Sequence, residues 1–208
     1  MPIKSIVHHV LDRKKAGLCF LVVALPALFF YAISLATMVA HGFSVMDSLR
    51  DPAQTRDESS FLGFLSNIGT WLWVSATAIS VFTWLTGDFQ ATSRRRELVV
   101  LVGLLSIMLA VDDFFMIHDR YISQRICYLA YALCAGAILV RHYRLIAEID
   151  GLAFLLAGAM LASSILVDLS QPWMPSAYLQ LQILEEGLKF MGAAMWMYFV
   201  GRVASFRP

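Results

Sequence analysis

Long runs of apolar residues, separated by short polar segments, extend along most of the chain. Six runs are candidates for membrane spans, at about residues 16–40, 61–86, 98–117, 125–140, 151–169 and 178–200. An α-helix needs about 20 predominantly apolar residues to cross a bilayer, and these runs approach or exceed that length. The pattern predicts an all-α polytopic membrane bundle of six transmembrane helices, with residues 1–208 forming a single transmembrane domain.

Composition supports a membrane location. Hydrophobic residues make up 59% of the chain and charged residues 15%, whereas soluble domains contain about 45–50% apolar and about 25% charged residues. The first run exceeds the roughly 7–15 apolar residues of a secretory signal peptide, so we expect it to remain as the first span. No basic face suggests a nucleic-acid partner, and the cysteines lie within apolar runs, which predicts packing roles.

Lys and Arg residues are distributed unequally between the two sides of the predicted bundle. With six spans, one side receives the basic N-terminus, residues 94–96, Arg141 with Arg144, and the C-terminal Arg202 and Arg207. Cytoplasmic loops are enriched in Lys and Arg, so this side is predicted to be cytoplasmic. Both termini would then be cytoplasmic.

Two polar groups interrupt the predicted spans. The first comprises Asp112, Asp113, His118 and Asp119 at the end of the third span, and the second comprises Gln182, Glu185, Glu186 and Lys189 in the sixth. At 100° per residue the second group falls within about a 100° arc, which is one helix face. A central Asp costs about 2.5–3.5 kcal/mol to insert, so we expect these residues to serve a function. The predicted orientation places both groups in the outer half of the bundle.

The geometry of the first group leaves two interpretations open. On a straight helix Asp112 and Asp119 align, whereas Asp113 and His118 project to either side. Either the helix ends before His118, or only some of these residues form one site. A purely structural interpretation is also open, in which the helix end reaches the lipid headgroups and a glutamate pairs with Lys189 to fix helix packing.

The excess of acidic residues in the outer half predicts a bound cation. Five acids accompany one lysine there, namely Asp112, Asp113, Asp168, Glu185 and Glu186 with Lys189. Like charges at short range cannot all stay ionised, so either several carboxyl groups hold protons or a cation neutralises them. Carboxylates with histidine suit zinc or another transition metal, and carboxylates alone suit calcium or magnesium. We expect a divalent metal, with zinc as the candidate, bound by Asp112, His118 and Glu185.

Both motifs resemble known membrane families. The motif Asp112-Asp113-x4-His118-Asp119, paired with Glu185-Glu186-x2-Lys189-x2-Gly192, resembles a group of bacterial multi-span proteins with the motifs Asp-[Asp/Glu]-x4-His-[Asp/Glu] and Glu-Glu-x2-[Glu/Lys]-x2-Gly. This resemblance implies a bacterial inner-membrane location and no known activity. The second motif is similar to the first motif of PrsW-type intramembrane proteases, and the overall design resembles alkaline ceramidase-like membrane hydrolases, which implies an acid/His zinc site and a lipid amide substrate.

The leading hypothesis is a metal-dependent hydrolase of a lipid or lipid-like substrate, with its site open to the outer face. In it Asp113 or Glu186 acts as general base on a metal-bound water, and Lys189 holds a glutamate ionised or stabilises an oxyanion. The alternatives are a proton- or cation-coupled transporter, in which the acids titrate, and a non-catalytic membrane subunit whose polar site fixes assembly with a partner. The oligomeric state is left open.

Overall fold

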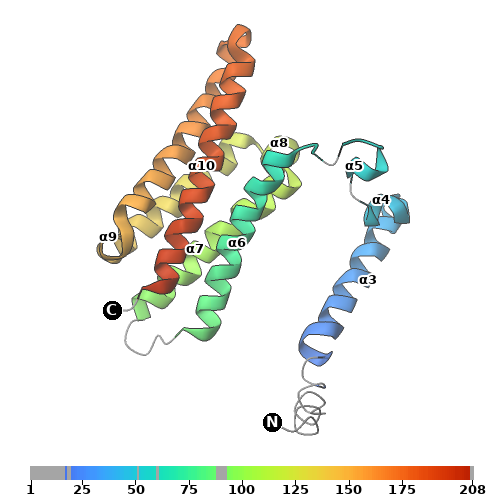
Figure 1. The fold of residues 1–208 in the computed structure, drawn as a ribbon, viewed down its shortest axis with the longest axis horizontal. Helices are drawn as coiled ribbons and strands as arrows, with labels where there is room; N and C mark the ends of the chain where they lie inside the picture. The colour runs from blue at the N-terminus through green and yellow to red at the C-terminus, as the bar shows by residue number, and fades with distance from the viewer. Residues whose placement is uncertain (1–16, 18–19, 51, 60, 88–92, 207–208) are drawn as a thin grey trace, which may run out of the picture. The chain divides into compact units, whose positions relative to one another are not determined.

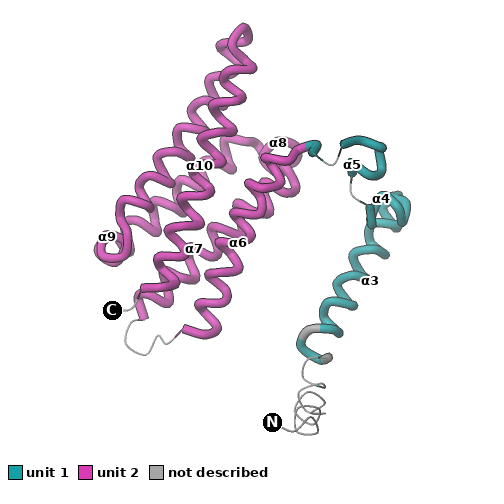
Figure 2. Tube along the Cα trace, viewed as in Figure 1, with its two compact units in different colours: residues 1–62 teal, residues 63–208 magenta. Residues whose placement is uncertain are grey.

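The computed structural model describes residues 17, 20–50, 52–59, 61–87 and 93–206. These residues form helices and their connections, and no strand occurs among them, which confirms the prediction of an all-helical protein for this part of the chain (Figure 1). The chain divides into two compact units, residues 1–62 and residues 63–208 (Figure 2). We describe each unit by itself, and a single domain over the whole chain stays a prediction.

The first unit contains one apolar helix and two short helices. A π-helical turn, η1 (Phe20–Ala24), leads into α3 (Leu25–Ala40), which is followed by α4 (Val45–Leu49) and α5 (Pro52–Thr55). No residue of α3 is buried within the structure. The predicted first span over 16–40 corresponds to η1 and α3, although its first residues lie partly outside the described part of the chain.

The second unit contains the remaining predicted spans. It comprises α6 (Phe64–Thr86), α7 (Ser93–Phe115), a short α8 (Ile117–Arg120), a long α9 (Gln124–Ser170), two 3₁₀ turns over Gln171–Trp173 and Pro175–Ala177, and α10 (Tyr178–Ser205). Three helical segments of the described chain are long and apolar enough to cross a membrane, at Phe64–Thr86, Ser93–Phe115 and Gln124–Trp173. These segments and α10 match the predicted second to sixth spans in position.

Helix α9 contains two of the predicted spans, because the chain reverses direction within it. His142 (φ −119°, ψ 17°) and Asp150 (φ −171°, ψ 77°) have non-helical backbone angles, and Figure 1 shows two antiparallel arms that meet near the α9 label. Oδ1 of Asp150 accepts a hydrogen bond of 3.1 Å from the backbone N–H of Ala153, which caps the second arm. The arms correspond to the predicted spans at 125–140 and 151–169.

The core of the second unit lies where α6, α7, α9 and α10 meet. The ring of Trp196 lies 5.8 Å from that of Phe154 and 5.9 Å from that of Phe199. Nε1 of Trp196 donates a hydrogen bond of 2.9 Å to Oγ of Ser106, so the buried indole N–H is satisfied. Near the C-terminal end of α10, Nη2 of the buried Arg95 donates a 2.7 Å hydrogen bond to the carbonyl of Ala204. A cation there also interacts favourably with the α10 dipole.

Close packing of α10 on the second arm of α9 depends on Gly192. A Cβ atom added there would lie 2.7 Å from Cγ of Leu161 and 3.2 Å from its backbone nitrogen. Small residues let membrane helices approach closely, and here any side chain would push the two helices apart.

Replacing Gly192 with valine should therefore destabilise the second unit by about 1–3 kcal/mol, the usual cost of overpacking. We expect a lower melting temperature in detergent for Gly192→Val. Gly201→Val is the matched control on the same helix, because a Cβ at Gly201 meets nothing within 4 Å. Equal melting temperatures for the two variants would contradict the assigned packing.

Candidate functional site

A left-handed turn after α7 positions the first polar group. Helix α7 ends at Phe115, and Met116 adopts φ 52° and ψ 46°, a conformation uncommon for a residue other than glycine. The turn directs His118 back toward Asp112. The His118 backbone N–H donates a 2.9 Å hydrogen bond to Oδ1 of Asp112, and its ring Nδ1 lies 2.7 Å from Oδ2. Of the two geometries left open by the sequence, the helix that ends before His118 is the one observed.

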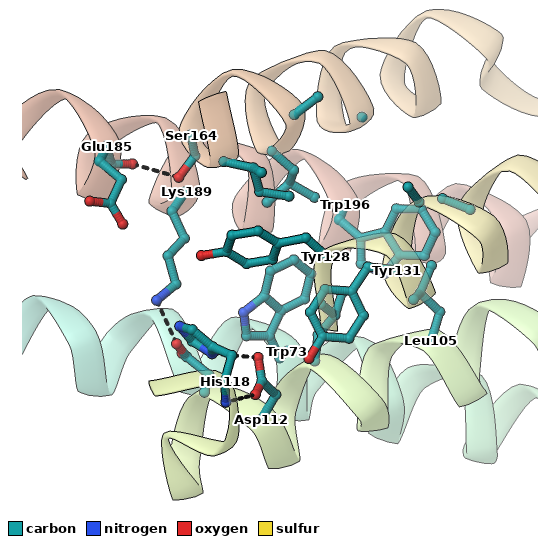
Figure 3. Close-up of a pocket in the computed structure, with 18 of the residues that line it drawn as sticks. Trp73, Leu105, Asp112, His118, Tyr128, Tyr131, Ser164, Glu185, Lys189 and Trp196 are labelled. Atoms are coloured by element: carbon teal, nitrogen blue, oxygen red, sulfur yellow. Dashed lines mark hydrogen bonds and ion pairs between the residues drawn. The ribbon is translucent and has the colours of Figure 1, made fainter. Parts of the chain in front are cut away.

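The Asp112–His118 pair lies largely away from solvent. The side chain of Asp112 is 8% exposed and that of His118 is 15% exposed, and the Tyr131 hydroxyl points toward Asp112 (Figure 3). Nε2 of His118 lies 3.4 Å from Oδ1 of the exposed Asp119. The hydrogen bond with Asp112 raises the pKa of His118 above its usual value, although burial opposes this effect. The Asp112 contact selects the ring form with hydrogen on Nδ1 and leaves Nε2 for proton transfer.

A second ion pair joins three helices. Nζ of Lys189 on α10 lies 2.6 Å from Oδ1 of Asp113 on α7, and Oγ1 of Thr70 on α6 donates a 3.0 Å hydrogen bond to Oδ2 of the same carboxylate. The Asp113 side chain is 8% exposed. Lys189 therefore contacts Asp113, whereas the sequence suggested a glutamate as its partner.

Uncharged polar side chains contact the remaining acids. Nε2 of Gln171 donates a 2.5 Å hydrogen bond to Glu185, and Nε2 of Gln182 lies 3.4 Å from Oε1 of Glu186. The backbone carbonyl of Glu185 also accepts a 3.0 Å hydrogen bond from Oγ of Ser164. Asp168 accepts hydrogen bonds from Tyr128, at 2.8 Å, and from Gln124.

Sequence reasoning did not identify four of these partners, Gln124, Tyr128, Tyr131 and Gln171, as part of the site. Neutral polar residues are inexpensive at span ends, so none of them is unusual in composition. One indication was available, because Gln171 follows Asp168 by three residues and so lies on the same side of a helix.

Three of the acids, together with His118 and Lys189, line one end of a cavity of about 200 Å³. Its polar end contains Asp112, Asp113, His118, Tyr128, Glu185 and Lys189, and its apolar end contains Leu105, Leu109, Ala135, Phe154, Leu161 and Trp196. Figure 3 shows His118 and Asp112 on the opposite wall from Glu185, with Lys189 extending between the walls. Of the residues predicted to form the site, five line this cavity, and Glu186 lines a neighbouring one. The cavity is amphipathic, as a site for a small amphiphile would be.

The arrangement of ligand atoms bears on the predicted metal site. Among the described residues, no group of three or more His, Cys, Asp or Glu side chains is placed to hold a metal ion. Both carboxylate oxygens of Asp112 contact His118, and Glu185 contacts Gln171 instead. The shared metal site of Asp112, His118 and Glu185 stays a prediction, and in the structure these side chains take part in hydrogen bonds with other protein groups.

The fold and the cavity define a helical protein with three segments of membrane-spanning length and an amphipathic cavity. A sequence family described as Domain of unknown function (DUF8692) matches residues 18–203, so the chain belongs to this family. No curated protein and no solved structure matches the chain. The resemblances inferred from the two motifs stay predictions.

Replacing Lys189 alone should destabilise the protein more than replacing both members of its ion pair. Lys189→Met leaves the Asp113 carboxylate without its cation, which we expect to cost about 3 kcal/mol. Asp113→Asn combined with Lys189→Met removes the buried charge and retains a group that accepts the Thr70 hydrogen bond, so most of this loss should be recovered. Thermal unfolding in detergent checks the order of the variants. A double variant less stable than Lys189→Met would contradict the pairing.

Replacing His118 should change the pH dependence of stability. Because the pKa of His118 is raised, its ion pair with Asp112 contributes fully below the usual histidine pKa of about 6.5 and is lost as pH rises through the raised value. The melting-temperature deficit of His118→Gln should therefore be largest in mildly acidic buffer and should shrink in alkaline buffer. The control is His41→Gln, because His41 is exposed and its ring Nδ1 contacts a backbone carbonyl, that of Thr37, at 2.8 Å. A deficit that grows with pH would be inconsistent with the pair.

Proposed function

We propose that this protein is a six-span membrane hydrolase, in the bacterial inner membrane, that acts on a lipid-like amphiphile bound in the cavity. The proposal rests chiefly on one observation: the hydrogen-bonded Asp112–His118 pair and Lys189 line the polar end of a cavity whose other end is apolar. A lipid has the same division, with a polar linkage at one end and a hydrocarbon chain at the other.

The proposed topology has both termini in the cytoplasm. It is supported by the positions of α6, α7, the two arms of α9 and α10, which match five of the predicted spans, and by the Lys and Arg distribution. In this topology α7 runs outward, so Asp112 and Asp113 in its last turn lie toward the outer face. The polar end of the cavity then lies near the level of lipid ester or amide groups, and its apolar end lies deeper.

The proposed chemistry uses His118 as both acid and base. Nε2 of His118 accepts a proton from water while the water oxygen bonds to the substrate carbonyl carbon and the carbonyl electron pair moves onto its oxygen. His118 then returns the proton to the leaving alcohol or amine as the bond to carbon breaks. Asp112 stabilises the imidazolium through Nδ1, as a carboxylate does in related acid–base pairs, and Lys189 stabilises the negative oxygen.

In a metal-dependent form of this proposal, one divalent ion would be bound by Asp112, His118 and Glu185, and Asp113 or Glu186 would act as the general base. When bound, such an ion would activate water and polarise the carbonyl. Metal analysis of purified protein separates the two forms. Stoichiometric metal that is lost from an Asp112→Ala, Glu185→Ala variant would favour the metal-dependent form, and the absence of stoichiometric metal would favour the acid–base form.

Release of fatty acid from a panel of ester- and amide-linked lipids, measured with purified protein in nanodiscs, tests the function. We expect Asp112→Asn and His118→Gln to lower the rate by about 10²–10⁴-fold, the usual contribution of a general acid or base. Glu148→Gln is the control, because Glu148 is exposed and lines neither the cavity nor its neighbour, and it should retain most of the rate. Folded wild-type protein that releases no fatty acid from any member of the panel would contradict the proposal.

A further inference from the structure

A second cavity, of about 510 Å³, lies beside the first, between α6 and α10. Its lining is mainly apolar and includes Leu65, Ile183, Phe190, Met191 and Ala193. Three residues, Trp73, Asp113 and Lys189, line both cavities. The Asp113–Lys189 ion pair and the buried Trp73 therefore form a wall that the two cavities share.

The shared wall is charged, whereas much of the lining on either side of it is apolar. The wall presents the Asp113–Lys189 pair to both cavities, and His118 and Tyr128 also line the first cavity. A molecule that occupies both cavities must have two hydrocarbon arms and a polar linkage between them. A single-chain amphiphile would fill only one cavity.

A third groove shows that not every hollow on this unit has that chemistry. It has a volume of about 580 Å³ and lies on α6 and α7, lined by residues such as Val74, Phe82, Ile107 and Phe114, and no charged residue contributes to it. It shares no lining residue with either cavity. An apolar surface of this kind suits the lipid-facing side of a membrane helix pair. The other two cavities differ from it because they share the charged Asp113–Lys189 pair.

We propose that the substrate is a two-chain lipid, with one hydrocarbon chain in each cavity and its polar linkage at the Asp113–Lys189 pair. This inference rests on the proposed function and names the substrate class of the same site. Neither Glu185 nor Glu186 takes part in any of the ion pairs in the described part of the chain. A positively charged amine headgroup on the lipid therefore suits these two acidic side chains. Glu186 lines the second cavity and is exposed, so it is accessible to such a headgroup.

Two glycines allow each cavity to be filled separately. Gly158 lines the first cavity and Gly187 lines the second. A Cβ atom added at either position meets nothing within 4 Å. Leucine at these helical positions should therefore be tolerated by the fold, because it also favours the helix over glycine. Gly136→Leu is the matched control, since Gly136 is equally open and lines neither cavity.

The test measures binding of dioleoyl-phosphatidylethanolamine and of its single-chain lyso form to full-length protein in detergent, by displacement of a fluorescent lipid. We expect Gly158→Leu and Gly187→Leu each to weaken binding of the two-chain lipid by about tenfold or more, and only one of the two to weaken binding of the lyso form. Gly136→Leu should weaken neither lipid. If Gly158→Leu or Gly187→Leu leaves binding of the two-chain lipid unchanged, or if both variants weaken the two lipids equally, the two-chain inference is overturned.

The two-chain binding site and the hydrolase activity are tested by separate measurements, so each proposal can fail without the other. The expected binding pattern without fatty-acid release would remove the hydrolase proposal and leave the two-chain site in place. Conversely, hydrolysis that depends on Asp112 and His118 but is unaffected by Gly187→Leu would remove the two-chain site and leave the hydrolase. Melting temperatures of the three leucine variants show that each protein is folded when its binding is measured.

Discussion

A charge buried among helices needs a partner, and in the second unit Lys189 and Asp113 meet this constraint for each other. Charged groups removed from water need a close partner, and here the partner comes from another helix, at 2.6 Å. Because Thr70 also contacts Asp113, three helices meet at one carboxylate. The same pair is the shared wall of two cavities. One carboxylate therefore connects three helices and also lines the space that remains between them.

The sequence predicted the helices and the grouping of the charges better than it predicted the pairing. Apolar runs identified α6, α7, both arms of α9 and α10, since burial in lipid requires length and apolarity alone. Because a charged side chain is costly in lipid, the charges within the apolar runs also indicated which side chains face the space between the helices. Pairing was harder to predict, because it depends on helix rotation and on one backbone angle at Met116, neither of which leaves a pattern in composition.

The core and the cavity are arranged in series along α10. Toward its C-terminal end, Trp196 and Phe199 pack closely with Phe154 and leave no polar group of the indole unsatisfied. About two and three turns before Trp196, respectively, Lys189 and Glu185 line the polar end of the cavity. A rigid, well-packed segment thus supports a more open one, which is the usual way in which a protein holds binding groups in place.

Met116 gives the Asp112–His118 contact a second consequence. A methionine with positive φ stores local strain of the order of 1–3 kcal/mol, and such a turn persists only when its surroundings hold it. The two hydrogen bonds between His118 and Asp112 span that turn and stabilise it. One of these bonds comes from the main chain and the other from the imidazole, so the carboxylate that orients His118 also holds the strained turn that leads toward α9.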